Sequence, residues 1–390
     1  MKNFKDTVLD LHKKNIGKLD VLPNIEIENK DDLSIAYTPG VAIPCMEIFN
    51  DKSKAYEYTM KGKTVAIITD GSAVLGLGKI GPEASLPVME GKSCLLYRFA
   101  KIQAMPIAVD SFEPKEIIKV AKLIAPNFSA IMLEDISAPN CVEIEETLQR
   151  DLDIPIFHDD QHGTAIVVSA ALINALKLVN KSIENIKIVV TGSGAAGSAI
   201  IKLLNKLGAK DIWNFNSSGV IRKSNYNHYN KLVKRLIDDK LIVSNHDHAE
   251  LSEIVKDADV FIGVSAKNIL SEAMVNSMNK DAIVFALANP DPEIDPLVAK
   301  RAGAKVVGTG RSDYPNQINN VLVFPGLMKG TILSRAKSIT DDMKILACKT
   351  LASLVKDSDI SEEHILPDIF DERVPEIISE AIVKANKKDW

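Results

Sequence analysis

The sequence predicts an α/β protein: an N-terminal α/β domain followed by a Rossmann-like, doubly wound dinucleotide-binding domain. Short β-branched runs alternate with helix-length amphipathic stretches, which is typical of βαβ units and parallel sheets. A glycine-rich turn, residues 192–197, directly follows one of these runs. Pairs of acidic residues follow two others, at 134–135 and 159–160. These three observations predict both the fold and the edge of each sheet where ligands bind.

The first four strand-like runs are expected in the N-terminal domain and the other five in the second. In chain order they cover residues 64–69, 106–110, 130–133, 154–157, 186–191, 211–215, 260–264, 282–286 and 305–307. Helical segments are expected at residues 113–124, 164–179, 197–207, 271–278 and 295–302, and again from residue 341 onward, with a break near 366–375. This pattern predicts one domain over residues 1–160 and another over 161–390, with a helical tail that could pack on either.

Composition limits the class of protein. The chain has 390 residues, of which 46% are hydrophobic and 25% charged, enough for two domains with their own cores. The net charge of -5 argues against nucleic acid as a partner. We expect no apolar run that approaches the roughly 18 to 20 residues needed to cross a bilayer, and therefore no membrane span. No signal peptide is expected, and the four scattered cysteines form no CxxC pair. The sequence therefore predicts a cytoplasmic globular protein, most consistent with an enzyme.

The turn G-S-G-A-A-G at residues 192–197 lies between a buried-strand pattern and a helix. This is the context in which G-x-G-x-x-G indicates dinucleotide binding rather than a plain tight turn. Gly192 permits the turn, Gly194 lets the backbone approach a pyrophosphate, and Gly197 allows close helix packing. The start of the helix offers free N–H groups and the positive end of its dipole to the anion.

The residue expected to contact the adenosine ribose is unconventional. An acid usually follows about 20 residues after the glycine turn, but the strand 211–215 ends in Asn216. An asparagine can hydrogen-bond a 2′-hydroxyl, but it lacks the charge that repels a 2′-phosphate. Arg222 and Lys223 could reach a 2′-phosphate if the loop folds back, although such residues are more often solvated. The choice between NAD and NADP therefore stays open.

The two acidic pairs are Glu134-Asp135 and Asp159-Asp160, each at a strand end. Ligands of open parallel sheets bind at the carboxyl ends of strands, although a single acidic pair there is often only a surface loop or a helix cap. Three or four carboxylates without a thiolate or imidazole cluster favour a hard dication, Mg²⁺ or Mn²⁺. The flanking residues His158 and His162 are expected to have structural or supporting roles.

At this point a specific resemblance emerges: the chain resembles the short bacterial-type malic enzymes over about residues 33–344. The matching blocks, in family order, are YTPGVA at 37–42, TDGSAVLGLG at 69–78, PVMEGK at 87–92, LEDI at 133–136, HDDQHGTA at 158–165, ANP at 288–290, TGRSDYPNQ at 309–317, NN at 319–320 and FPG at 324–326. The resemblance implies an NAD- or NADP-dependent, Mg²⁺- or Mn²⁺-requiring enzyme that converts (S)-malate to pyruvate and CO₂. It also implies a homodimer.

The resemblance also implies roles for individual residues. The implied metal ligands are Glu134, Asp135 and Asp160. The implied catalytic residues are Lys92, which takes the hydroxyl proton, Tyr37, which donates a proton to carbon, and Asp159, which supports proton transfer. Substrate would be bound by Lys92, Asn289 and Asn320. The cofactor site would comprise Thr164, Gly192, Ser193, Gly194, Ala195, Ala196, Gly197, Asn216 and Asn319. Asn216 departs from the family pattern, which usually has Asp there.

The chemistry sets a condition on Lys92. A lysine acts as a base only when it is partly neutral, and burial or a nearby cation promotes this state. We therefore expect a half-buried Lys92 with a lowered pKa. Three other readings remain open: a malolactic or oxaloacetate-decarboxylating enzyme on the same scaffold, a non-catalytic nucleotide sensor, and a generic hydroxy- or amino-acid dehydrogenase.

Overall fold

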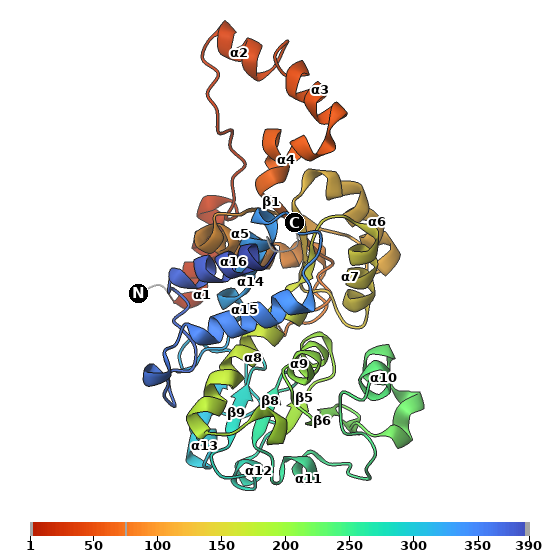
Figure 1. The fold of residues 1–390 in the computed structure, drawn as a ribbon, viewed down its shortest axis with the longest axis vertical. Coiled ribbons are helices and arrows are strands. Elements are labelled where there is room, and N and C mark those ends of the chain that lie inside the picture. Colours follow the sequence, from red (N-terminus) through yellow and green to blue (C-terminus); the bar gives the residue numbers. More distant parts are fainter. Residues whose placement is uncertain (1–2, 75, 387–390) are drawn as a thin grey trace.

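Two separate β-sheets organise the chain in the computed structural model, which describes residues 3–74 and 76–386 (Figure 1). Leu75, in the second of the matching sequence blocks, lies outside these residues. The first sheet has the order β2-β1-β3-β4, and the second β10-β9-β8-β5-β6-β7. All the pairings are parallel except β6 with β7. The strands are β1 (Thr64–Thr69), β2 (Gln103–Ala108), β3 (Ala130–Leu133), β4 (Ile156–His158), β5 (Lys187–Thr191), β6 (Asp211–Asn216), β7 (Gly219–Val220), β8 (Val260–Gly263), β9 (Ile283–Ala286) and β10 (Val306–Thr309).

Helices cover the two sheets and connect them. In the first half they are α1 (Phe4–Asn15), α2 (Lys30–Ala36), α3 (Ala42–Asn50), α4 (Ala55–Tyr58), α5 (Pro82–Ala100), α6 (Pro114–Ile124), α7 (Asn140–Asp151) and α8 (Asp159–Val179). In the second half they are α9 (Ala195–Lys206), α10 (Lys231–Asp238), α11 (Leu251–Val255), α12 (Glu272–Asn276), α13 (Pro296–Arg301), α14 (Phe324–Leu333), α15 (Asp341–Ser353) and α16 (Arg373–Asn386). A short 3₁₀ helix, η6 (Asn320–Leu322), precedes α14.

The predicted α/β class is confirmed, and each of the nine expected strands overlaps an observed one. The strand expected at residues 106–110 begins earlier, because β2 pairs with the whole length of β1 from Gln103 onward. The two-residue strand β7 was not predicted, since its pairing with β6 depends on a tight reversal at residues 217–218 and not on a periodic pattern. Strand β1 is buried along its entire length, as expected for a strand with neighbours on both sides and helices on both faces.

Helix α8 joins the two sheets. It starts directly after β4 and ends shortly before β5, packing against α9 and α15 on the way. The boundary predicted near residue 160 therefore falls in its first turn. With 21 residues and a mean hydropathy of 1.5, α8 is long and apolar enough to cross a membrane, contrary to the expectation that the sequence holds no such run. Most of this helix is buried in the protein, where it packs against other helices.

The C-terminal helices pack across both halves. Helix α15 lies against α8, whereas α14 and α16 pack against each other and contact α5 beside the first sheet. Gly326 and Gly330 make the close α14–α16 contact possible, because a Cβ at either residue would lie within 3 Å of α16 atoms. The predicted break before the last helix is present, and α16 begins at Arg373.

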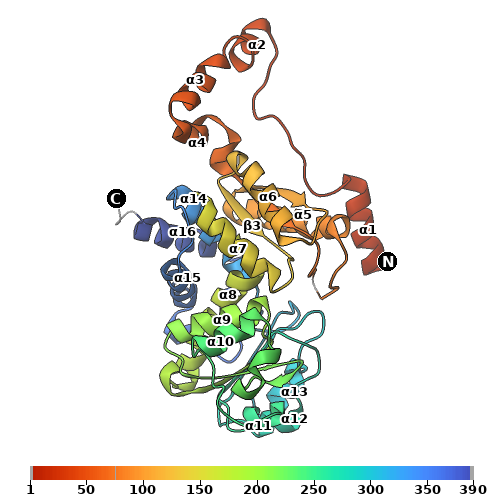
Figure 2. The ribbon, with the colours of Figure 1, turned by 90° about the vertical axis from the view of Figure 1, so that its right-hand side faces the viewer.

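An arm formed by α2 and α3 extends away from the rest of the chain (Figures 1 and 2). Residues 17–18 are anchored on α5, where the Lys18 backbone N–H donates to Glu90. Neither α2 nor α3 has a buried residue. Large apolar side chains of this segment are exposed, including Val21, Leu22, Ile35, Ile43 and Phe49. Exposed apolar side chains gathered in this way are typical of interaction surfaces.

The Asn174 side chain holds the C-terminal segment against α8 by hydrogen bonds, and its substitution tests their contribution to stability. It is fully buried in α8 and donates hydrogen bonds to the carbonyls of Ala352 and Ile365, at 2.8 and 3.0 Å. We predict that Asn174→Ala lowers the free energy of unfolding by about 1–3 kcal/mol, because two buried acceptors lose a donor. The control is Lys177→Ala, a change in the same helix α8. It removes only a surface ion pair with Asp357 and should change stability little. Urea titration followed by circular dichroism measures both; equal stability of the two variants would contradict this account.

Candidate active site

The two acidic pairs predicted from the sequence meet at one edge of the first sheet. Strands β3 and β4 are parallel neighbours, with Leu133 opposite His158, so the residues that follow them lie side by side. Glu134, Asp135 and Asp160 each place a carboxylate oxygen within 4.8 Å of the others. The Asp135 backbone N–H also donates to the Asp160 carboxylate at 2.9 Å, which fixes one turn against the other.

Lys92 reaches this cluster from the middle of α5. Its ammonium lies 2.6 Å from the Asp159 carboxylate and 2.8 Å from that of Glu134, and 4.5 Å from the centre of the Phe324 ring. The side chain is only 9% exposed, so the predicted burial is present. Burial alone would lower the pKa of Lys92, but the nearby carboxylates, Asp159 first, outweigh it and raise this pKa. The expectation of a partly neutral lysine is therefore wrong for this arrangement, because it left the surrounding acids out.

Gly163 allows Asp159 its position. A Cβ at Gly163 would lie 1.9 Å from a carboxylate oxygen of Asp159 and 3.1 Å from the Asn320 side chain. Only glycine fits at this point of α8. Because Gly163 has no side chain, Asp159 and Asn320 can both approach it. The predicted substrate residue Asn320, in η6, thus lies beside the Lys92–Asp159 pair.

The cluster suits a divalent cation. Burial raises the pKa of Glu134 well above its usual range, and the neighbouring Asp160, Asp159 and Asp135 carboxylates add to the effect even though Lys92 opposes it. In the part of the chain that is described, one Glu134 carboxylate oxygen is buried without a hydrogen-bond donor. Buried acids crowded in this way are stable as anions only beside a strong positive charge. Glu134, Asp135 and Asp160 therefore fit the predicted role of ligands for Mg²⁺ or Mn²⁺.

Glu145 supports the site from α7 and was not found from the sequence. Its buried carboxylate accepts hydrogen bonds from the His158 backbone N–H, the Gln161 amide and the His162 ring, at 3.0, 3.0 and 2.9 Å. Burial would raise the pKa of Glu145, but the His162 ring lowers it on balance. The three contacts fix the first turn of α8, as expected of the supporting role predicted for the histidines. A signal existed: Cys141, Glu145 and Leu148 share the buried face of α7.

The glycine turn has the geometry expected of a dinucleotide site. Gly192 has a φ of 102°, and a Cβ there would lie 2.6 Å from the Val264 carbonyl. A Cβ at Gly197 would lie 2.1 Å from the Gly192 carbonyl, so helix α9 packs tightly on the turn. Gly194 precedes α9 and faces open space, where a pyrophosphate can approach the backbone. Ser193 donates to Asn214 at 2.7 Å, and Ala195 and Ala196 form the first turn of α9.

Asn216 ends β6 as predicted. Its side-chain oxygen accepts a hydrogen bond from the Ser218 N–H at 2.8 Å, which leaves the amide N–H₂ as a donor. Arg222 instead turns toward the next loop, where it donates to the Asp247 carbonyl. The end of β6 thus carries a neutral donor that can bind an oxygen of either a ribose hydroxyl or a phosphate.

The remaining predicted ligands lie on loops at the domain junction. The Asn289 backbone contacts the loop of the first sheet, since a Cβ at Gly76 would lie 2.4 Å from the Asn289 carbonyl. Asn319 caps η6 by accepting from the Val321 N–H, and Thr164 lies partly exposed in α8. The buried carboxylate of Glu293, another residue missed from the sequence, accepts from the N–H groups of Ser265 and Ala288 and so holds the Asn289 loop.

Within one chain, Tyr37 lies apart from the acid cluster, Lys92 and Asn320. It follows α2 in the projecting arm (Figure 1) and is 66% exposed, whereas the Lys92 side chain of α5 is buried. The structure thus brings together the predicted acids, Lys92 and Asn320, but leaves the predicted proton donor outside.

Comparison with known families and proteins agrees with this geometry. The family models "Malic enzyme, N-terminal domain" and "Malic enzyme, NAD binding domain" match residues 16–115 and 161–386. The chain is 50% identical to a bifunctional malic/malolactic enzyme of Bacillus subtilis, covering 98% of this chain and 93% of that protein. It is 49% identical to an NAD-dependent malic enzyme of Geobacillus stearothermophilus (95% and 76% covered). It is 41% identical to an NADP-dependent malic enzyme of Escherichia coli, covering 98% of this chain but 52% of that longer protein.

Solved structures show the same architecture. The malic enzyme from Pyrococcus horikoshii superposes with a TM-score of 0.94 at 43% identity, covering 99% of this chain and 91% of that one. The NAD-dependent malic enzyme from Thermotoga maritima gives a TM-score of 0.92 at 43% identity, covering 96% and 98%. Both the predicted fold and the predicted order of the two domain types are therefore confirmed.

The acid cluster makes a direct prediction for metal binding. Asp160→Asn keeps the shape of the side chain but removes its charge, so the affinity for Mn²⁺ should fall by roughly 10–100-fold or more. Electron paramagnetic resonance of free Mn²⁺ measures this in the absence of substrate. Asp153→Asn changes an exposed aspartate outside the cluster and serves as the control. Wild-type Mn²⁺ affinity in the Asp160 variant would show that the ion binds elsewhere.

Proposed function

This chain belongs to the malic enzyme family, and we propose that it oxidises and decarboxylates (S)-malate to pyruvate and CO₂ with NAD or NADP as oxidant. The observation that carries the proposal is the buried ammonium of Lys92, held by Asp159 and Glu134 beside the acid cluster. A generic dehydrogenase does not need this carboxylate set. The glycine turn before α9 supplies the nucleotide site that a non-redox decarboxylase does not require.

Lys92 and Asp159 are placed to move the hydroxyl proton. Lys92 can accept it only after passing its own proton to Asp159, whose carboxylate lies 2.6 Å away. Burial raises the pKa of Asp159, so this carboxyl group is able to hold a proton. Glu134 also holds the Lys92 ammonium, at 2.8 Å, and its use as a metal ligand would weaken this contact and favour proton transfer. Lys92 in this way serves as the proton acceptor with Asp159 behind it.

The bound groups supply the rest of the chemistry. A divalent cation held by Glu134, Asp135 and Asp160 would polarise the C2 oxygen of the substrate, first as hydroxyl and then as carbonyl. The nicotinamide would accept the hydride from C2. Asn289 and Asn320 are placed at the domain junction to orient the substrate carboxylates. Cleavage of the C3–C4 bond then releases CO₂ and leaves an enol that needs a proton at C3, the role predicted for Tyr37.

We propose that Tyr37 fulfils this role in the partner subunit of a homodimer. Its own site lies away from the arm, and the arm exposes Val21, Leu22, Ile35, Ile43 and Phe49. A second copy of the chain can bury this apolar surface, and a two-fold symmetric pair does so for both copies at once. The site in each subunit would then be completed by the arm of the other.

The neutral donor at the end of β6 supports use of both NAD and NADP, because Asn216 does not repel a 2′-phosphate by charge. A malolactic reaction is the second candidate, favoured by the high identity to the bifunctional malic/malolactic enzyme of Bacillus subtilis. The same site would produce lactate if the reduced cofactor stayed bound and returned its hydride to pyruvate.

The reaction can be identified by its products. With malate and Mn²⁺, we predict net formation of reduced cofactor with either NAD or NADP, in step with pyruvate and CO₂. Lys92→Ala should lower this rate by about 10²-fold or more, because the proton acceptor is removed, while cofactor binding stays intact because the glycine turn is not altered. Lactate formation without net reduced cofactor would establish the malolactic reaction instead. Near-normal turnover of the Lys92 variant would refute its role.

If each active site combines Lys92 of one subunit with Tyr37 of the other, two inactive variants should regain activity when they form a mixed dimer. When Tyr37→Phe and Lys92→Ala chains are co-expressed with different tags, each mixed dimer has one site with both side chains intact. Random pairing should therefore restore roughly a quarter of the wild-type rate per chain, since half of the dimers are mixed. Each variant expressed alone is the control. If Tyr37 acts within its own chain, the mixed dimers will stay inactive.

A further inference from the structure

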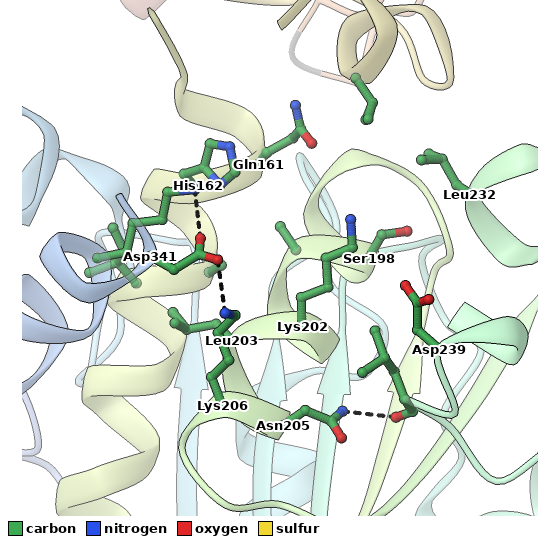
Figure 3. A pocket seen from close by; sticks show the side chains of 16 residues that line it. Gln161, His162, Ser198, Lys202, Leu203, Asn205, Lys206, Leu232, Asp239 and Asp341 are labelled. Carbon is green, nitrogen blue, oxygen red and sulfur yellow. Dashed lines mark hydrogen bonds and ion pairs between the residues drawn. The ribbon is translucent and has the colours of Figure 1, made fainter. Parts of the chain in front are cut away.

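A cavity lies between the two halves of the chain, along α8 and α9 (Figure 3). Gln161, His162, Ala165 and Ile166 line it. At 3.6 residues per turn these positions share one face of α8, whereas Asp159, Asp160 and Thr164 share the other. The cavity also follows α9 from Ser198, directly after the glycine turn, to Lys206. None of its lining residues is among those assigned above to the metal, the substrate or the dinucleotide.

The cavity is large enough for a small organic molecule. Its volume is about 400 Å³, within the usual range for ligand sites. Five helices or their ends contribute to it: α7, α8, α9, α10 and α15. Most of the wall is apolar, formed by Val142, Ala165, Ile166, Ala199, Leu203 and Leu232. Such a wall favours an occupant with an apolar body.

The charged residues around the cavity determine which charge an occupant should carry. Lys202, Lys206 and Lys344 line it together with Asp239 and Asp341. Lys206 and Lys344 are paired with Asp341, at 2.9 and 3.2 Å, and Asp239 is exposed at the rim. Lys202 is half-buried, points toward Ser198 and the cavity in Figure 3, and has no ion-pair or hydrogen-bond partner in the described chain. One positive charge is thus left for an occupant to neutralise.

The uncharged polar residues that line the cavity are held in place by hydrogen bonds and add no positive charge to it. The Gln161 amide and the His162 ring are both tied to the buried Glu145 carboxylate, so they form a fixed surface and not a mobile one. The Ser198 hydroxyl donates to the Ser193 carbonyl. A polyphosphate would meet Asp239 and Asp341 and a mostly apolar wall, with only one unpaired lysine to bind it. These features disfavour nucleotides and favour a single negative charge.

We propose that this cavity is a binding site for a small organic monoanion with an apolar body, whose acidic group pairs with Lys202. The apolar part would lie against Ala165, Ala199 and Leu203 between α8 and α9. An occupant would then touch α8 on the face opposite Asp159 and Asp160. A short-chain carboxylate such as octanoate has both the charge and the shape required.

Displacement of the fluorescent monoanion 1-anilinonaphthalene-8-sulfonate by octanoate tests the proposal on the intact protein. We expect octanoate to displace the dye from the wild type, and Lys202→Gln to weaken octanoate binding by about tenfold, because a charge-assisted contact is lost. Lys349→Gln removes an exposed lysine of α15 that does not line the cavity and should bind like the wild type. Octylamine, equal in length but positively charged, should not displace the dye at the same concentrations.

A second variant keeps the test independent of Lys202. Ala199→Trp places a large side chain in the cavity from α9 and should abolish octanoate binding with little effect on binding of NAD at the glycine turn. The proposal is overturned if Lys202→Gln binds octanoate as tightly as Lys349→Gln does. It is equally overturned if octylamine competes as well as octanoate, because the dye would then report an unselective apolar surface such as the exposed arm.

Discussion

The buried ion pair of Lys92 with Asp159 and Glu134 is the contact on which the rest of the site depends. It joins the middle of α5, the end of β3 and the first turn of α8 at one point with almost no solvent. Charges in such a place are tolerated only when they are paired, and removal of one partner leaves another buried charge uncompensated. With Asp135 and Asp160 next to this pair, negative charge exceeds positive charge locally. The excess makes the site receptive to a dication and favours the charged form of Lys92.

The surrounding fold keeps this charge cluster in register. Glu145 receives three hydrogen bonds from the start of α8, and Glu293 receives two from loops that follow β8 and β9. Gly163 is needed so that Asp159 and Asn320 can approach each other. Fixed supporting contacts of this kind limit the motion of the groups predicted to contact metal and substrate. Helix α8 carries Asp159 and Asp160 in its first turn and packs against α9 and α15 farther along, so one helix connects the acid cluster with the second half.

The sequence predicts those features of the fold and the site that depend on neighbouring residues, and it misses those that depend on residues far away in the chain. Strand runs and the glycine turn have signals within a few residues, and the meeting of Glu134 with Asp160 follows from the rule that parallel strands end at one edge. The protonation of Lys92 depends instead on acids about 40 and 70 positions away, and local burial alone gave the wrong direction for its pKa. Glu145 looks like an ordinary helix acid unless the buried face of α7 is identified first. The motif around Tyr37 implies its chemistry but not the chain in which it acts, since this depends on the projecting arm.

The most direct measurement of the central claim is the rate of malate-dependent cofactor reduction by enzyme dialysed against EDTA, before and after Mn²⁺ is returned. If Glu134, Asp135 and Asp160 hold a cation that the Lys92 site requires, the rate will fall to background without metal and recover in proportion to bound Mn²⁺. Circular dichroism should show the same fold in both states, because the ion pair of Lys92 remains. A full rate in the metal-free protein, verified by elemental analysis, would contradict the account.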